Sequence, residues 1–358
     1  MKTSFKTASL ALGSLATLAA LGVMVTPSLS WALKYAAPGP RIPVDPSIPA
    51  WDPGQVVVEP EEELNLVGAD VMDEITLGWI KIFRQQHPRL SVTMEARASG
   101  TGGPALTEGR AHMAPVGREL MPAEEEAFVK KFGYKPLAIK VATGSVGSLG
   151  KTATSVILVH KDNPIHGLTF AELDAIYSKD RKRGHADVST WGDLGVKGVW
   201  ATRPIHLYGL RPPNGIEQFV KNMVLLGGEW KDGIQQVKAD GFTHGFTVAA
   251  HDMARNTSGL TYGLLANVTP DVKVLPLAEH AGDPFIEPTQ ENVYAHRYPL
   301  SRFVYIFVNR APGKPLEPKI REFLRLVLSR EGQQVVSDEA VYLPLTASVV
   351  REELAKLE

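Results

Sequence analysis

Positions 99–103 read Ser-Gly-Thr-Gly-Gly and have the composition of an anion-binding turn. An alternating run suited to a strand precedes them at 91–97, and a stretch suited to a helix follows. Glycines allow backbone N–H groups to converge on one ligand, hydroxyls add donors, and the amides of a helix start carry about half a positive charge. The same residue types also form ordinary helix caps. The candidate ligands in this turn are Ser99, Gly100, Thr101 and Gly102.

Three successive strand-to-helix units position this turn. Each unit has an apolar strand, a turn of small or polar residues and a helix with apolar residues on one side. The three turns lie at 68–70, 99–103 and 117–118. This alternation predicts a parallel or mixed α/β sheet, in which ligands bind beyond the carboxyl ends of the strands. We therefore expect the three turns at one edge of one sheet.

The rest of the chain predicts further α/β structure. The middle part, 156–277, has strands and helices of its own, 303–308 is a continuous apolar strand, and 320–328 is an amphipathic helix. Between 33 and 63, seven prolines and few apolar residues predict an extended, poorly ordered lead segment. At 358 residues the chain is long enough for two domains.

The N-terminus has the pattern of a secretory signal peptide. Lys2 and Lys6 precede an apolar, uncharged run at 8–25, and Ser30-Trp31-Ala32 predicts cleavage after Ala32. A membrane anchor is the alternative, but the run is diluted by Gly, Ser and Thr and falls short of the roughly 20 strongly apolar residues that a span needs. We therefore expect export to the periplasm.

Composition excludes several classes of function. The chain contains no cysteine, which excludes disulfides, thiolate catalysis, cysteine-based zinc sites and a lipidated cysteine. Removal of Lys2 and Lys6 with the signal peptide takes the formal net charge from −1 to −3, so no nucleic-acid partner is expected. An anionic ligand would have to be captured by local geometry.

The order and spacing of the motifs resemble the periplasmic substrate-binding proteins of phosphate ABC transporters. The resemblance extends over about 64–345 and rests on several short motifs. They are Gly68-Ala69-Asp70, Ser99-Gly100-Thr101-Gly102-Gly103, Gly117-Arg118-Glu119-Leu120, Thr190-Trp191-Gly192-Asp193-Leu194-Gly195, Tyr298-Pro299-Leu300-Ser301-Arg302 and Tyr342-Leu343-Pro344-Leu345.

This resemblance implies an α/β fold, the two-lobed periplasmic binding protein of type II, each lobe a mixed, mostly parallel sheet flanked by helices. Lobe 1 would comprise 64–150 and 298–358, and lobe 2 the inserted 151–297, after the signal peptide 1–32 and the Pro-rich lead segment 33–63. The lobes would close on a ligand and present it to an ABC permease in the inner membrane. Such proteins usually work as monomers, which is the expectation here.

The predicted site departs from the family's pattern. Phosphate-binding members usually have Ser or Thr in the first turn, Ser or Asp in the third, and Ser-Gly-Thr at a helix start of the second lobe. This chain has Ala69 and Val71, then Gly117, then Ile216 after Asn214-Gly215. Each charge-assisted hydrogen bond to a buried phosphate is worth roughly 1.5–3 kcal/mol. The lost hydroxyls imply weaker binding, or a larger or less charged ligand.

The remaining candidate ligands are charged or amide groups. Arg118 and Arg211 offer forked donors, Asp70 would accept the proton of a protonated phosphate, and Asn214 and Gly215 would donate amide N–H groups. Each has a structural alternative. The alternatives are a helix cap for Asp70, an ion pair with Glu119 or Glu124 for Arg118, a turn stiffened away from the cleft by Pro212-Pro213 for Arg211, and an ordinary turn for Asn214 and Gly215.

Enzyme chemistry has little support in the sequence. Positions 145–152 nearly match a phosphate-binding P-loop, but Ser145 replaces its first glycine, and Ser148 with Lys151 forms a Ser-x-x-Lys pattern without its companion motifs. A loose cluster of His244, His251 and Asp252 is better interpreted as surface residues than as a metal site. We expect no catalytic residue, cofactor or metal.

Three functions follow in order of preference. The first is capture of inorganic phosphate, or a related oxyanion, for an ABC permease. The second is a degenerate family member with weak or no phosphate binding that acts as a periplasmic sensor or interaction protein. The third is a phosphate-releasing hydrolase, which a phosphatase assay would test.

Overall fold

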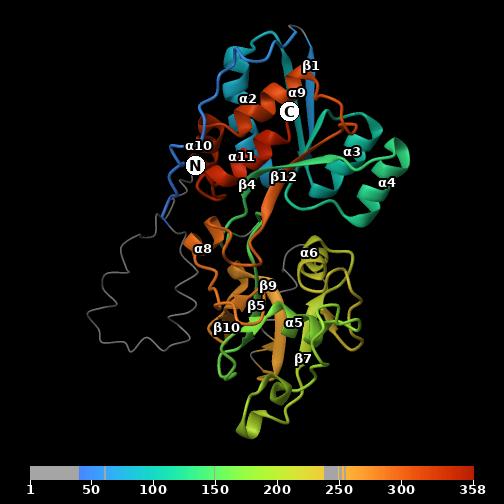
Figure 1. Ribbon diagram of the computed structural model, residues 1–358, viewed down its shortest axis with the longest axis vertical. Coiled ribbons are helices and arrows are strands. Elements are labelled where there is room, and N and C mark those ends of the chain that lie inside the picture. Colours follow the sequence, from blue (N-terminus) through green and yellow to red (C-terminus); the bar gives the residue numbers. More distant parts are fainter. Residues whose placement is uncertain (1–39, 60–61, 149, 238–248, 250–251, 254) are drawn as a thin grey trace, which may run out of the picture.

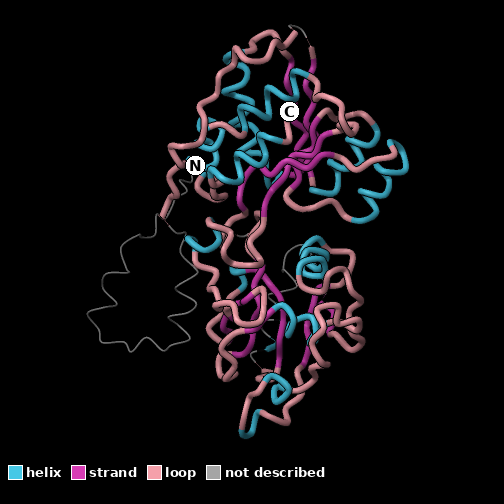
Figure 2. The backbone as a smooth tube through the Cα atoms, viewed as in Figure 1, coloured by secondary structure: helices cyan, strands magenta, loops and turns pink. Residues whose placement is uncertain are grey.

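The computed structural model describes residues 40–59, 62–148, 150–237, 249, 252, 253 and 255–358. In this part of the chain two lobes lie end to end along the long axis of the molecule (Figure 1). Each lobe is built on one five-stranded sheet. Figure 2 shows the chain crossing from the sheet of one lobe to the sheet of the other. No helix within these residues is long and apolar enough to cross a membrane.

The sheet of lobe 1 has the strand order β2-β1-β3-β12-β4. Strands β1, β2 and β3 are parallel, and β12 is antiparallel to both β3 and β4. The predicted sheet is thus mixed, but half of its strand pairings are antiparallel, because β4 leaves the lobe and β12 returns to it. The strands are β1 (Glu63–Ala69), β2 (Ser91–Arg97), β3 (Met113–Val116), β4 (Leu137–Thr143) and β12 (Phe303–Val308).

Helices cover both faces of this sheet (Figure 1). One face packs against α2, α9, α10 and α11 around a core that includes Trp79, Phe83 and Phe323, and the other packs against α3 and α4 around Leu106 and Phe128. The helices are α2 (Asp73–Gln86), α3 (Gly102–Glu108), α4 (Pro122–Phe132), α9 (Pro318–Val327), α10 (Arg330–Glu339) and α11 (Ala347–Ala355).

Lobe 2 contains the second sheet, in the order β10-β5-β9-β7-β8, and a two-stranded pair of β6 and β11. In the larger sheet β5 is antiparallel to β10 and β9, and β7 is parallel to β9 and β8. Its strands are β5 (Ser155–His160), β7 (His206–Leu210), β8 (Gln235–Val237), β9 (Gly259–Leu264) and β10 (Val272–Leu275), with β6 (Leu168–Thr169) and β11 (Leu277–Ala278) beside them. The helices are α5 (Phe170–Tyr177), α6 (Gly215–Met223) and α8 (Gln290–Tyr294).

Local sequence explains where these elements begin and end. All six residues of β5 are buried, which fits the apolar run at 156–159 in its middle. Helix α5 begins with a capping box in which Thr169 and Glu172 each accept from the other's backbone N–H, at 3.2 and 2.7 Å. Helix α4 begins at Pro122 and ends before Gly133, whose φ of 82° is the left-handed conformation that glycine adopts most easily.

Two crossover segments connect the lobes, after β4 and before β12. They are hydrogen-bonded to each other, since the Gly144 N–H donates to the Arg302 carbonyl at 2.8 Å and the Ser155 N–H donates to the Leu300 carbonyl at 3.4 Å. Paired crossovers of this kind let two lobes move about a common line while each lobe stays intact.

The Pro-rich lead segment is packed against lobe 1 over its described part, 40–59, where the sequence predicted poor order. Ile48 is buried in the lobe 1 core, and the Trp51 ring stacks on Phe83 at a centroid distance of 6.2 Å. The Trp51 Nε1–H donates to Glu322 at 2.8 Å, and the Arg330 N–H donates to the Pro49 carbonyl at 2.9 Å. Two large apolar side chains and backbone hydrogen bonds therefore order a segment whose composition is otherwise that of a linker.

We expect Trp51→Ala to lower the free energy of unfolding by about 2 kcal/mol, since it removes a half-buried ring and leaves the Glu322 carboxylate without its donor. Urea denaturation of the mature chain measures this change. Val57→Ala is the matched control, because Val57 lies in the same segment but is 79% exposed. Its effect is expected within about 0.5 kcal/mol. If Trp51→Ala lowered the free energy of unfolding by no more than Val57→Ala does, the packing of Trp51 would contribute nothing to stability.

Candidate functional site

A cavity of about 230 Å³ lies between the lobes, where three parts of the chain meet. Lobe 1 contributes turns at the carboxyl ends of β1, β2 and β3, lobe 2 contributes the start of α6, and both crossover segments complete the wall. The lining residues are Val71, Ser99, Gly117, Arg118, Lys151, Thr152, Ala153, Asn214, Gly215, Ile216, Leu264 and Arg302. The expectation that the three turns share one edge of the lobe 1 sheet is confirmed.

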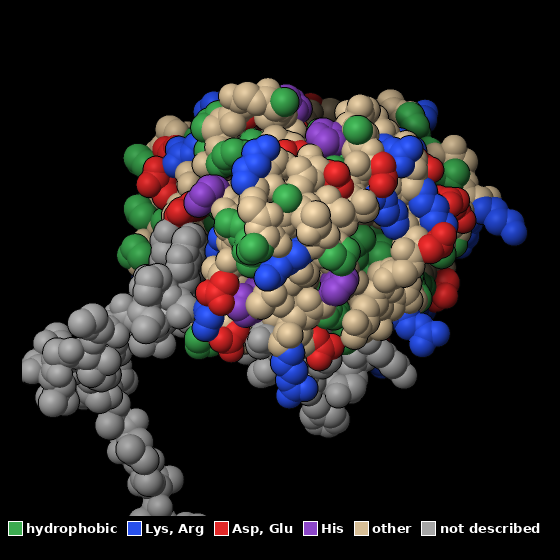
Figure 3. Space-filling model, turned by 90° about the horizontal axis from the view of Figure 1, so that it is seen from below, with side chains coloured by type: hydrophobic (Ala, Val, Ile, Leu, Met, Phe, Trp, Pro, Cys, Tyr) green, Lys and Arg blue, Asp and Glu red, His purple; other side chains and the backbone are tan. Residues whose placement is uncertain are grey.

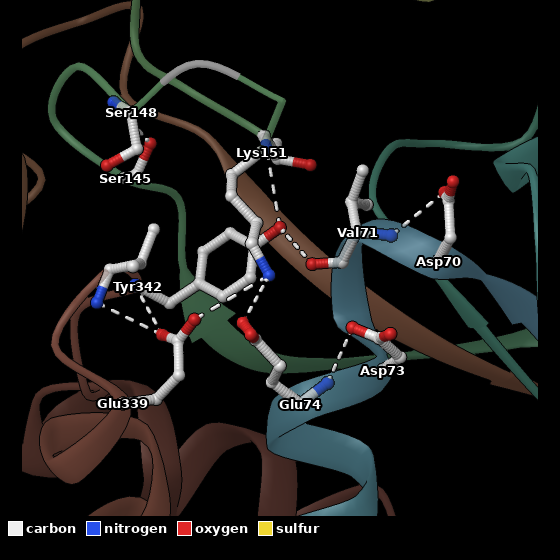
Figure 4. A network of polar contacts seen from close by, with 11 residues as sticks. Asp70, Val71, Asp73, Glu74, Ser145, Ser148, Lys151, Glu339 and Tyr342 are labelled. Atoms are coloured by element: carbon white, nitrogen blue, oxygen red, sulfur yellow. Dashed lines mark hydrogen bonds and ion pairs between the residues drawn. The ribbon is translucent and has the colours of Figure 1, made fainter. Parts of the chain in front are cut away.

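The first turn places Asp70 outside this cavity. Asp70 opens a short 3-10 helix, η2 (Asp70–Met72), its side chain is exposed, and its Oδ1 accepts from the Val71 N–H at 2.9 Å (Figure 4). The carboxylate therefore bonds the backbone of its own turn, although Ala69, and not Asp70, is the N-cap of η2. Val71 faces the cavity instead and offers an apolar side chain.

The second turn brings one of its four candidates to the cavity wall. Ser99 lines the cavity, at the start of η3 (Ser99–Thr101). The Thr101 hydroxyl donates to the carbonyls of Ala98 at 2.8 Å and Gly68 at 3.3 Å, so it holds the turn together. Gly100 is exposed and is not part of the lining. Gly102 is buried, and a Cβ there would lie 2.9 Å from Val116, so packing within lobe 1 accounts for this glycine.

The third turn provides Arg118, which is both a cavity residue and half of an ion pair. Its Nη1 and Nη2 atoms each lie 2.8 Å from an oxygen of Glu124, and Nη1 also donates to the Glu119 carbonyl. Both side chains are largely buried, and the forked geometry fixes the guanidinium. The ion-pair alternative with Glu124 is thus present, and it holds Arg118 as a rigid part of the wall.

Lobe 2 reaches the cavity through the first turn of α6. The Asn214 side chain accepts from the Ile216 N–H at 2.9 Å and the Glu217 N–H at 3.4 Å, so it is the N-cap of the helix. Gly215 lies directly against lobe 1, since a Cβ there would be 2.6 Å from the Arg118 Cδ atom. Arg211, at the end of β7, is exposed and does not line the cavity, as its structural alternative predicted.

Three polar cavity residues were missing from the sequence prediction: Lys151, Thr152 and Arg302. The first two belong to the 145–152 stretch that resembled a P-loop, and the third ends the Tyr298-Pro299-Leu300-Ser301-Arg302 motif. The 145–152 stretch and the motif that ends at Arg302 are both visible in the sequence. Neither predicts a place in the site, because only the pairing of the crossovers brings these residues to the cavity.

Lys151 is held by two carboxylates (Figure 4). Its Nζ atom is 2.7 Å from Glu74 Oε2 on α2 and 3.7 Å from Glu339 Oε1 on α10. Burial lowers the pKa of Lys151, but the hydrogen bond to Glu74 and the charge of Glu339 outweigh it, and the pKa lies above its ordinary value. The neighbouring Thr152 hydroxyl donates to the Gly117 carbonyl at 2.5 Å, which fastens this crossover to the third turn.

Arg302 is the most deeply buried cation of the cavity, with a side chain 4% exposed. Its Nη2 atom is 3.3 Å from Glu119 Oε2. Its guanidinium carbon lies 4.6 Å from the ring centroid of Phe219 on α6, a cation–π contact between the second crossover and lobe 2. The Nε atom is buried and has no hydrogen-bond partner among the residues that the structure describes.

Three of the four positions that lack the family's hydroxyl donors lie in the cavity wall. Val71, Gly117 and Ile216 all line the cavity, whereas Ala69 is fully buried in the lobe 1 core. The polar residues that line the cavity are consequently one serine, one threonine, one asparagine and three cations. Each cation has a carboxylate partner, so the wall is charged but locally compensated.

Other kinds of site find little support in the part of the chain that the structure describes. No group of three or more His, Asp or Glu side chains there is arranged to hold a metal ion. His244 and His251, of the loose cluster noted in the sequence, lie outside the described residues. Lysines and arginines are interspersed with acidic side chains on the face of lobe 2 shown in Figure 3, in place of the one-sign surface that a nucleic-acid footprint requires.

Two mixed sheets flanked by helices, two paired crossovers and a cavity between the lobes define a two-lobed periplasmic binding protein. A family model described as a PBP superfamily domain matches residues 58–331, and the chain belongs to this superfamily. The phosphate-binding protein PstS of Pseudomonas aeruginosa is 36% identical over 315 residues, which cover 88% of this chain and 92% of that relative.

Solved structures show the same fold. An ABC-type phosphate transport receptor from Vibrio cholerae matches with a TM-score of 0.50 at 18% identity, over 78% of this chain and 99% of its own. PstS from Borrelia burgdorferi matches with a TM-score of 0.52 at 15% identity, over 80% of this chain and 100% of its own. Together with the family match, these likenesses confirm the resemblance and the fold class predicted from the sequence.

Proposed function

We propose that this chain is an exported solute-binding protein that captures phosphate in the interlobe cavity and delivers it to an ABC permease. The observation that carries the proposal is the 36% identity, over nearly the whole chain, to a protein named for phosphate binding. The cavity agrees with it. At about 230 Å³ it is smaller than the roughly 300–1,000 Å³ of sites for drug-sized ligands, and its polar side chains are hydroxyls, one amide and cations.

The residues proposed to contact phosphate are those of the predicted set that reach the cavity, with the crossover residues added. Ser99 donates from lobe 1, the Gly215 N–H donates from lobe 2, and Lys151 and Arg302 supply positive charge from the crossovers. The signal peptide 1–32 lies outside the described residues, and export to the periplasm is part of the proposal. The monomeric state and the absence of a catalytic step are also parts of the proposal.

The proposal is tested by calorimetric titration of residues 33–358 with phosphate, sulfate, molybdate and a phosphate ester. We expect saturable phosphate binding, and Ser99→Ala is expected to weaken it about tenfold by removing one hydrogen bond to an anion. Ser91→Ala, an exposed serine on β2, is the control and should bind like the unchanged protein. The ester should be recovered intact, whereas released phosphate would favour a hydrolase. A chain that binds none of these anions would refute the proposal and favour a sensor or interaction protein.

A further inference from the structure

Among the three cavity cations, Arg302 is the one with a buried nitrogen that has no hydrogen-bond partner among the described residues. Both terminal nitrogens of Arg118 are occupied by Glu124, and the Lys151 ammonium lies between Glu74 and Glu339. Arg302 has one ion pair, at 3.3 Å, and a buried Nε whose partner is missing among the described residues. Buried N–H groups of a guanidinium are nearly always hydrogen-bonded, so Arg302, which lines the cavity, keeps donor capacity that the described residues do not use.

The position of Arg302 couples it to both lobes. Its backbone carbonyl accepts from Gly144 of the other crossover, and its guanidinium stacks on Phe219 of α6 in lobe 2. Glu119, its carboxylate partner, lies in lobe 1, in the loop that follows the third turn. A ligand bound by this guanidinium would therefore contact the group on which the two lobes and the second crossover converge.

Glu119 can release Arg302 at low cost. Its side chain is 37% exposed, and its Oε1 accepts from the Tyr305 hydroxyl at 3.2 Å. After losing the guanidinium, the carboxylate would keep this hydrogen bond and gain water, so its charge would not be left buried and unpaired. An oxyanion can thus replace Glu119 as the partner of Arg302 without leaving the carboxylate buried and unpaired.

We propose that Arg302 binds the oxyanion directly, and that Glu119 is a competing counter-ion that sets the affinity. This inference rests on the proposed function of the cavity. Glu119 competes with the ligand for the guanidinium, so removing its negative charge should strengthen binding. A residue that served only to hold the structure together would have the opposite effect, because its loss would loosen the cavity.

Glu119→Gln is the decisive variant. We expect it to tighten phosphate binding about 3- to 10-fold in calorimetric titration at low salt, while the amide oxygen keeps its acceptor role toward Tyr305. Glu125→Gln is the matched control. Glu125 is 39% exposed and pairs with Lys135 at 2.7 Å, so it tests the same change of charge without the contact to Arg302. Its effect on phosphate affinity is expected to be less than about twofold.

Arg302→Lys separates direct contact from charge alone. Lysine keeps the positive charge but loses the forked donors, and we expect phosphate binding to weaken at least about tenfold. In the double variant with Glu119→Gln, the gain seen in Glu119→Gln alone should disappear, since it depends on the guanidinium. Thermal melting of each variant reports whether it is folded.

The outcomes separate the two proposals. If the unchanged protein fails to bind phosphate, the proposed function falls, and this inference with it. If it binds phosphate but Glu119→Gln binds equally or more weakly, the function stands and the inference is overturned. The inference is also overturned if the gain persists in the double variant, because Glu119 would then act on the ligand without Arg302.

Discussion

Gly215→Val is expected to weaken phosphate binding at least about 100-fold, which corresponds to about 2.7 kcal/mol. A Cβ at this position would lie 2.6 Å from the Cδ atom of Arg118 across the interlobe cavity. Arg118 cannot readily move aside, because Glu124 holds its guanidinium through two hydrogen bonds of 2.8 Å. The branched side chain must therefore push the first turn of α6 away from lobe 1 and separate the two halves of the site.

Calorimetric titration measures the loss, and small-angle scattering measures the separation of the lobes. Gly54→Val is the matched control, since a Cβ at Gly54 would meet no atom closer than 3.4 Å and lies far along the chain from the cavity. It is expected to bind phosphate like the unchanged protein. If Gly215→Val retained full affinity, the contact between α6 and Arg118 would be irrelevant to ligand capture.

Acidification is expected to remove about 2–3 kcal/mol of stability through His296 alone. This residue lies between α8 and the second crossover, where its Nε2 atom is 2.8 Å from the Thr143 hydroxyl and its ring stacks on Phe303 at 3.9 Å. Burial, reinforced by the charge of Lys140, lowers the pKa of His296 from 6.5 to about 4. The folded protein therefore favours the neutral ring.

The direction of the pH effect follows from this depressed pKa. Above pH 6.5 the ring is neutral in the folded and the unfolded chain, and its contribution to stability is fully present. As the pH falls from 6.5 to about 4, the unfolded chain binds a proton that the folded protein resists, and this contribution is lost. Urea denaturation at pH 7 and pH 4 should show a smaller loss for His296→Gln, whose amide does not titrate.

His280→Gln controls for the removal of a histidine. Its ring is exposed, so the variant should show the same loss between pH 7 and pH 4 as the unchanged protein. If His296→Gln lost as much stability as His280→Gln, the acid sensitivity would have to arise elsewhere in the chain.

Much of the fold was predictable because its signals are local. The strands at 91–97 and 303–308 have the bounds expected from the sequence pattern. The alternation of strands and helices also predicted a parallel or mixed α/β sheet, and the resemblance to the phosphate-binding family implied the two lobes. The lead segment was different, because the order of 40–59 depends on Trp51 and Ile48 finding places on lobe 1, and composition carries no information about such partners.

The candidate site was only partly predictable. Of the residues predicted to bind a ligand, four line the cavity, namely Ser99, Arg118, Asn214 and Gly215, whereas Asp70, Gly100, Thr101, Gly102 and Arg211 do not. A turn rich in Ser, Thr and Gly indicates that polar groups gather, but the direction of each side chain is set by the neighbours that it meets. Thr101 and Asp70 each bond the backbone of their own turn, because donors and acceptors one to three residues away compete with any ligand.

The sequence by itself determined the class of this protein: strand-to-helix turns, their order and the family motifs follow from residues close together in the chain. Only the tertiary structure decided which groups face the cavity. Lys151, Thr152 and Arg302 lie there because two crossovers, about 150 residues apart in the chain, pair with each other between the lobes. Contacts over such separations depend on how whole lobes pack, and no local pattern of residues specifies them.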